Sequence, residues 1–85
     1  MTHIIEASFS FRHFTEEDVE RSISSMPNLQ RLDISHNIIN HPPSRLPKSL
    51  VSLNLSFNAK CKSLSGYLLN LHNLRELVIT NNNMI

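Results

Sequence analysis

Apolar residues recur at fixed positions in three segments of this chain. Residues 29–37, 50–58 and 74–82 each follow the pattern L-x-x-L-x-[LI]-x-x-N, at nearly constant intervals along the sequence. Apolar and polar residues alternate around the second leucine of each segment, which is typical of a short strand with one buried face. Self-similarity at a period of roughly 20–50 residues is the signature of repeat architectures. The pattern therefore predicts parallel strands that stack side by side over a shared apolar interior.

A weaker copy of the pattern lies one interval before the first clear one. Ile4, Ala7 and Phe9 fall on its apolar positions, whereas Arg12 stands where the asparagine is expected. We interpret residues 1–28 as a divergent N-terminal repeat made of a strand and a helix. The alternative is a strand unrelated to the repeats.

The segment after this weaker copy predicts a helix. Thr15 precedes three acidic residues, a combination that caps a helix N-terminus and complements its dipole. Val19, Ile23 and Met26 recur at helical spacing, and Pro27 ends the pattern. We expect a helix of about two and a half turns with one apolar stripe.

The later connecting segments predict much less regular structure. Three prolines forbid a regular helix between residues 38 and 49 and favour extended backbone. Between residues 59 and 73, three leucines are spaced to line a short helical turn. The prolines are Pro42, Pro43 and Pro47, and the leucines are Leu64, Leu68 and Leu71.

The three repeated segments resemble the leucine-rich-repeat family, whose strand signature LxxLxLxxN is followed by x-[LI]. The resemblance implies an α/β fold, a leucine-rich-repeat solenoid with a curved parallel β-sheet on its concave side and short helical or extended returns on its convex side. It implies three clear repeats after the divergent one, at 29–49, 50–73 and an incomplete 74–85. Ile39 and Met84 occupy the apolar position after the asparagine, but Lys60 departs from it. Short-period and plant-like spacings are mixed, so no subfamily is assigned.

The resemblance also implies a function: a non-catalytic adaptor or scaffold that binds a protein or peptide on its concave sheet. The solvent-facing strand positions mix charged, amide and aromatic side chains, as interaction surfaces do. The expected partner-binding residues are Arg31, Asp33, His36, Asn54, Phe57, Arg75, Glu76 and Val78. For Phe57, packing over a repeat edge stays open as the alternative. A second interpretation makes the chain the recognition part of a larger protein, such as a ubiquitin-ligase substrate receptor, a phosphatase regulator or a receptor ectodomain.

The asparagine that ends each repeated segment has an expected structural role. Its carboxamide carries both donors and an acceptor, so a buried copy can tie its own turn to the neighbouring one. We therefore expect Asn37, Asn58 and Asn82 to form a ladder along the stack.

Composition narrows the possible chemistry of these 85 residues. The formal net charge is +1 and the charged fraction 18%, with no basic stripe, so we expect no nucleic-acid partner. A single glycine excludes phosphate-cradling loops, and the five histidines lack ligand spacing. We expect no catalytic residue, no cofactor and no metal. The single cysteine, Cys61, lies between two lysines; an ordinary loop thiol is favoured, and a reactive thiol of lowered pKa is the alternative.

Location and assembly are also predicted from the sequence. No apolar run could span a membrane and no secretory signal is visible, so we expect a cytoplasmic protein without membrane contact. For the same reason, the glycosylation sequon that begins at Asn54 is interpreted as coincidence. The chain ends shortly after Asn82 without a cap, which predicts a fragment of a longer protein or self-association through that end.

Overall fold

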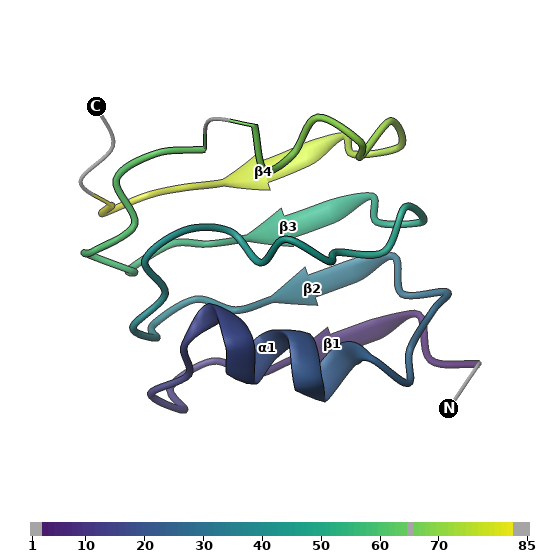
Figure 1. Ribbon diagram of the computed structural model, residues 1–85, viewed down its shortest axis with the longest axis horizontal. Coiled ribbons are helices and arrows are strands. Elements are labelled where there is room, and N and C mark those ends of the chain that lie inside the picture. The colour runs from purple at the N-terminus through teal and green to yellow at the C-terminus, as the bar shows by residue number, and fades with distance from the viewer. Residues whose placement is uncertain (1–2, 65, 83–85) are drawn as a thin grey trace.

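The computed structural model describes residues 3–64 and 66–82. Within these ranges the chain forms four strands and one helix. The strands are β1 (Glu6–Ser8), β2 (Arg31–Asp33), β3 (Ser52–Asn54) and β4 (Glu76–Val78), and the helix is α1 (Glu16–Ile23). All neighbouring strands are parallel and follow one another in sequence order, as Figure 1 shows. The parallel sheet predicted from the repeated segments is confirmed.

The strands pair so that equivalent positions of the repeated segments lie side by side. Ala7 pairs with Leu32, Leu32 with Leu53, and Leu53 with Leu77. Leu32 and Leu53 are buried, because this column points into the interior, whereas the residues on either side of it point outward. The alignment that places Ala7 of the weak N-terminal copy on Leu32 is the observed register of β1 and β2.

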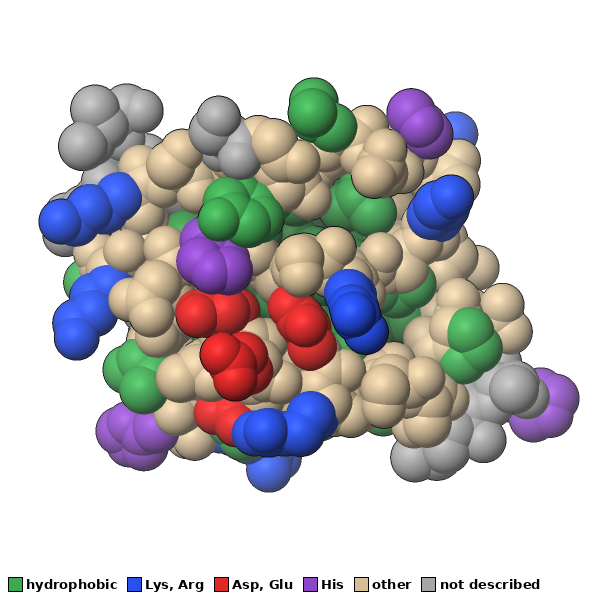
Figure 2. Space-filling model, in the orientation of Figure 1, with side chains coloured by type: hydrophobic (Ala, Val, Ile, Leu, Met, Phe, Trp, Pro, Cys, Tyr) green, Lys and Arg blue, Asp and Glu red, His purple; other side chains and the backbone are tan. Residues whose placement is uncertain are grey.

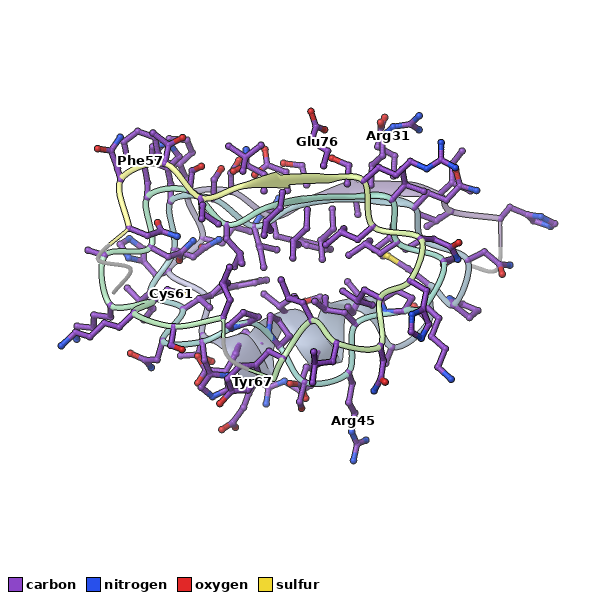
Figure 3. All side chains as sticks on the ribbon, turned by 90° about the horizontal axis from the view of Figure 1, so that it is seen from above. Arg31, Arg45, Phe57, Cys61, Tyr67 and Glu76 are labelled. Carbon is purple, nitrogen blue, oxygen red and sulfur yellow. The ribbon has the colours of Figure 1, made fainter. Side chains whose placement is uncertain are left out.

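Two layers enclose the core. The sheet forms one layer and the returning segments form the other, and aliphatic side chains fill the space between them (Figure 3). The side chains of Leu29, Ile34, Leu50 and Leu55 are completely buried there. We call the outward side of the sheet the open face, and the outward side of the returning segments the return face.

Helix α1 begins with the predicted cap but is shorter than predicted. Thr15 accepts a hydrogen bond from the Asp18 N–H, and the Asp18 carboxylate accepts one from the Thr15 N–H, so the capping box is complete. These bonds from Thr15, with the nearby Arg21 cation, hold the pKa of Asp18 below its ordinary value. The helix ends at Ile23, so Met26 lies outside it. The Met26 N–H donates to the Ile23 carbonyl, and the Met26 side chain is buried.

The second and third returns contain no helix among the described residues. The proline-rich second return is irregular, and two of its prolines, Pro42 and Pro43, are fully buried. In the third return, Leu71 donates its N–H to the Leu68 carbonyl, which makes a short turn of the expected kind. The prediction of thin returns after α1 is therefore confirmed for these residues.

A one-residue shift changes how the third return fills the core. Lys60, at the apolar position of the pattern, is exposed, and the next residue, Cys61, is completely buried in its place. Burial of the Cys61 thiol and the negative charge of Glu16 raise its pKa. The alternative of a reactive thiol with a lowered pKa is therefore wrong. The corresponding position Met84 lies outside the described residues.

The asparagines at the strand exits bond the backbone of adjacent turns. Asn37 accepts from the N–H groups of Arg12 and Phe14, and Asn58 accepts from the N–H of Ile39. The Asn58 carboxamide also donates to carbonyls of its own turn and of the turn before it. Asn82 accepts from the N–H of Asn58. Each carboxamide thus satisfies backbone groups that no strand ladder pairs.

Candidate functional site

The open face carries a depression over the paired strands. It has a volume of about 470 Å³, and the side chains around it come from all of β1, β2, β3 and β4. Viewed from the edge of the sheet in Figure 3, Arg31 and Glu76 point away from the core on the same side. The residues that line the depression are Glu6, Ala7, Ser8, Arg31, Leu32, Asp33, Ser52, Asn54, Glu76 and Val78.

Strand register arranges these side chains in two rows. Glu6, Arg31, Ser52 and Glu76 form one row, and Ser8, Asp33, Asn54 and Val78 form the next. Adjacent strands lie about 4.8 Å apart, so neighbours within a row are close enough to contact one ligand together. The rows hold three carboxylates and one guanidinium, a formal charge of −2 (one minus three), whereas the whole chain carries +1. These two rows of the open face are therefore acidic.

Two of the carboxylates are held in place by hydrogen bonds. The Ser52 hydroxyl donates to Oε1 of Glu76 at 2.6 Å. Oδ1 of Asp33 accepts from the N–H and the hydroxyl of Ser35, at 2.9 and 2.6 Å. These bonds use one oxygen of each carboxylate. Both groups are therefore oriented in advance, and the serine bonds leave the second oxygen of each for a ligand.

Aromatic side chains stack at the ends of the strands beside the depression. The ring centroids of Phe11 and His36 lie 4.0 Å apart, and those of His36 and Phe57 lie 4.2 Å apart, with nearly parallel planes. Phe11 is 72% exposed and Phe57 45% exposed. Their faces contact one another, so the stack turns ring edges toward solvent. It forms an apolar rim next to the charged rows.

The stack depends on an unusual backbone conformation. Phe11, His36 and Phe57 have φ angles of 59°, 56° and 60°, and Asn81 has 59° at the equivalent position of the next turn. The left-handed conformation costs non-glycine residues about 1–2 kcal/mol each. Stacking offsets part of this cost, at about 0.5–1.5 kcal/mol for each aromatic pair. Hydrogen bonds offset more of the backbone cost, because the N–H groups of His36 and Phe57 donate to carbonyls of the next turn at 3.0 and 2.9 Å.

The expected partner-binding residues separate into groups. Five of the eight line the depression, and two belong to the aromatic stack. Arg75 is not among them: it lies beside Gln30, Ser49, Val51 and Asn73 at a second depression. The five residues in the depression are Arg31, Asp33, Asn54, Glu76 and Val78.

The expected set also omitted residues that the fold brings to the same place. Glu6, Ser8 and Ser52 line the depression, and Phe11 begins the stack. The alignment of repeated segments already places each of them at a strand position equivalent to an expected residue. Extending the set along each aligned row would have found them.

The return face is acidic over α1. Figure 2 shows carboxylates gathered there, with a histidine and an apolar side chain beside them. The Asn40 N–H donates to Glu16, whose other oxygen lies 3.7 Å from Nε2 of His41, and the His41 ring stacks on Tyr67. Burial alone would raise the pKa of Glu16, but the Asn40 bond and the His41 ring lower it overall. These contacts tie the first return to the second and third.

Neither a metal site nor a membrane span is found in the part of the chain that the structure describes. No three histidine, cysteine or acidic side chains are grouped so as to hold an ion there. No described helix combines the length and apolarity that crossing a bilayer requires.

Comparison with known proteins finds similarity to a glycoprotein of two mammals. The chain is 36% identical over 56 residues to oligodendrocyte-myelin glycoprotein of Homo sapiens, and equally to that of Mus musculus. The matched region covers 66% of this chain and only 12% of either glycoprotein. No family model matches the chain, and no solved structure matches it.

This similarity corrects the expected location. Glycosylated chains are characteristic of secreted and cell-surface proteins, so resemblance to a glycoprotein conflicts with the cytoplasm. The prediction of a cytoplasmic protein is therefore wrong. That prediction rested on two absences, a visible secretory signal and an apolar run long enough to span a membrane, and such absences do not determine where a protein is located.

Proposed function

We propose that this chain is a non-catalytic protein-interaction module of the leucine-rich-repeat family, and that it binds a protein or peptide segment on the open face. The strand signature, the parallel sheet in sequence order and the similarity to a glycoprotein support this family. In this proposal residues 1–28 are a divergent first repeat, and 29–49, 50–73 and 74–85 are further repeats of a solenoid.

The arrangement of the open face carries the functional proposal. Strands that are distant in sequence contribute equivalent outward positions, so one ligand can contact all of them. The resulting surface combines charged groups, a carboxamide and an apolar rim, which is the composition of a protein interface rather than of a reaction site. The expected partner-binding residues, Arg75 excepted, lie on or beside this surface.

The proposal is tested by selecting ligands and then changing each face separately. A random-peptide display library is panned on the intact chain, and selected peptides are measured by fluorescence anisotropy. The open-face variant combines Arg31→Ala with Glu76→Ala, and the matched return-face variant combines Glu17→Ala with Arg45→Ala; all four side chains are exposed.

We expect binding to weaken at least about tenfold in the open-face variant, which corresponds to about 1.4 kcal/mol, and to be unchanged in the return-face variant. Equal binding by the open-face variant and the wild type would contradict the proposal. Circular dichroism of both variants checks that the fold is retained.

A further inference from the structure

The charges of the open face are distributed unevenly along its rows. Arg31 has Glu6 beside it on β1 and Asp33 two residues further along its own strand. Glu76 lies two strands away from Arg31, across the uncharged Ser52. The single guanidinium of the described rows therefore lies toward the β1 side, and the β4 side has a carboxylate without a nearby cation on its row.

We propose that the occupant of this depression is an extended peptide segment carrying two basic side chains, one bound by Asp33 and the other by Glu76. The inference rests on the proposed function, and it adds the chemistry of the partner. The supporting observation is charge complementarity: the two rows, with a formal charge of −2, attract cations and repel acidic segments.

The register of the sheet determines the spacing of the two basic residues. Asp33 and Glu76 are two strands and two residues apart. With strands about 4.8 Å apart and about 3.3 Å of rise per residue, their Cα atoms are separated by about 12 Å. An extended peptide covers that distance in about three to four residues. Because its side chains alternate between faces, residues i and i+4 point to the same side and residues i and i+3 do not, so the geometry favours basic residues at i and i+4.

The surroundings of the two carboxylates suit lysine or arginine rather than a metal ion. A separation of about 12 Å is far too large for one ion, which needs ligand oxygens at about 2.0–2.6 Å. Each carboxylate already accepts hydrogen bonds on one oxygen and keeps the other for an incoming ammonium or guanidinium group. In the row of Asp33, Asn54 offers a carboxamide to peptide backbone and Val78 offers a small apolar contact.

Synthetic fluorescent peptides test the inference by anisotropy. One peptide carries lysines at i and i+4 in a Gly-Ser-Val background, one has glutamates at the same positions, and one has the two lysines adjacent. We expect the spaced lysine peptide to bind at least about tenfold more tightly than the glutamate peptide and several-fold more tightly than the adjacent one. Its affinity falls as salt is raised, because exposed charge pairs are screened.

Isosteric variants test whether the carboxylates of Asp33 and Glu76 are the groups that bind the lysines. Asp33→Asn and Glu76→Gln keep the acceptor oxygens that Ser35 and Ser52 bond, so each removes only the charge. We expect each variant to weaken binding of the spaced lysine peptide about three- to tenfold. Glu17→Gln, an exposed change on α1, serves as the matched control and leaves binding unchanged.

The outcomes separate this inference from the proposed function. Equal or tighter binding of the glutamate peptide, or no effect of either neutralising variant, overturns the basic partner. If library-selected peptides still lose affinity in the Arg31→Ala, Glu76→Ala variant, the open face remains the binding surface and only the partner chemistry is wrong. If those peptides also keep their affinity, both proposals fail.

Discussion

The third and fourth strands carry the same sequence motif but are buried to different extents. Leu53 of β3 is completely buried, whereas its partner Leu77 of β4 is only partly buried. Two residues later, Leu55 is fully buried and Ile79 is 36% exposed. β3 lies between two strands, and β4 has a neighbour on one side within the described residues. The motif supplies the apolar side chain, and the neighbouring strands determine how much of it leaves water.

The asparagines show the same difference. Asn58 is completely buried and bonds carbonyls of Ile34 and Leu55 as well as the N–H of Ile39. Asn82 is only half-buried and bonds the turn before it. Identical residues in an array therefore contribute unequally to stability, as expected when free energy arises at the contacts between units.

The leucine column offers the largest test of this comparison. We expect Leu53→Ala to lower the free energy of unfolding by about 2–5 kcal/mol, because it leaves a cavity under three strands. Leu77→Ala should cost roughly half as much, since its side chain already keeps some contact with water. Urea denaturation followed by circular dichroism measures both. Equal losses would show that position in the stack does not matter.

The asparagine pair provides a test of intermediate size. Asn58→Ala leaves buried carbonyls and an N–H without partners, which costs about 1–3 kcal/mol. Asn82→Ala should cost less, because water can replace its bonds at a half-buried site. The unfolding midpoints of the two variants are compared under the same conditions. A larger loss in Asn82→Ala would reverse the proposed order.

The smallest test extends the comparison to the return face and depends on pH. Glu16 is largely buried against the second return and has a lowered pKa, whereas its neighbour Glu17 is exposed. A lowered folded-state pKa means that the Glu16 carboxylate stabilises the fold above the ordinary value of 4.5, and that this contribution is lost as pH falls through the folded-state pKa. Glu16→Gln should therefore cost about 0.5–1 kcal/mol at neutral pH and progressively less in acid.

Urea denaturation at several pH values measures this difference, with Glu17→Gln as the control. The control should unfold like the wild type throughout the range. A cost of Glu16→Gln that grows as the solution becomes more acidic would have the wrong sign.

Much of the fold could be predicted because its periodicity is local in the sequence. The spacing of Leu32, Leu53 and Leu77 predicts one column in a parallel sheet, and the observed register places them there. Thr15 and the acidic residues after it predict the start of α1. Two details of packing were not predictable in this way. Met26 lies outside the helix, yet its side chain is in the core. Cys61 is buried where the pattern places Lys60, because a one-residue shift in the third return turns a different side chain inward.

The candidate site was predictable only in part. Alternation along a strand shows that Asp33 and Glu76 face outward, but not that serine hydroxyls hold their carboxylates. Arg75 was expected among the partner-binding residues, and the fold places it at a different depression. The alignment of the repeated segments indicates the rows across the strands, but only the folded chain shows which members of those rows line one depression.

By itself the sequence determined which strand residues face the interior and that the strands are parallel, because period and alternation govern which side chains can leave water together. Tertiary structure alone decided which outward side chains line one depression and that the rings of Phe11, His36 and Phe57 stack. The depression follows from the register of the sheet, and the three stacked residues have in addition a left-handed backbone. No single segment contains that information, since the lining of the depression and the members of the stack come from different turns of the chain.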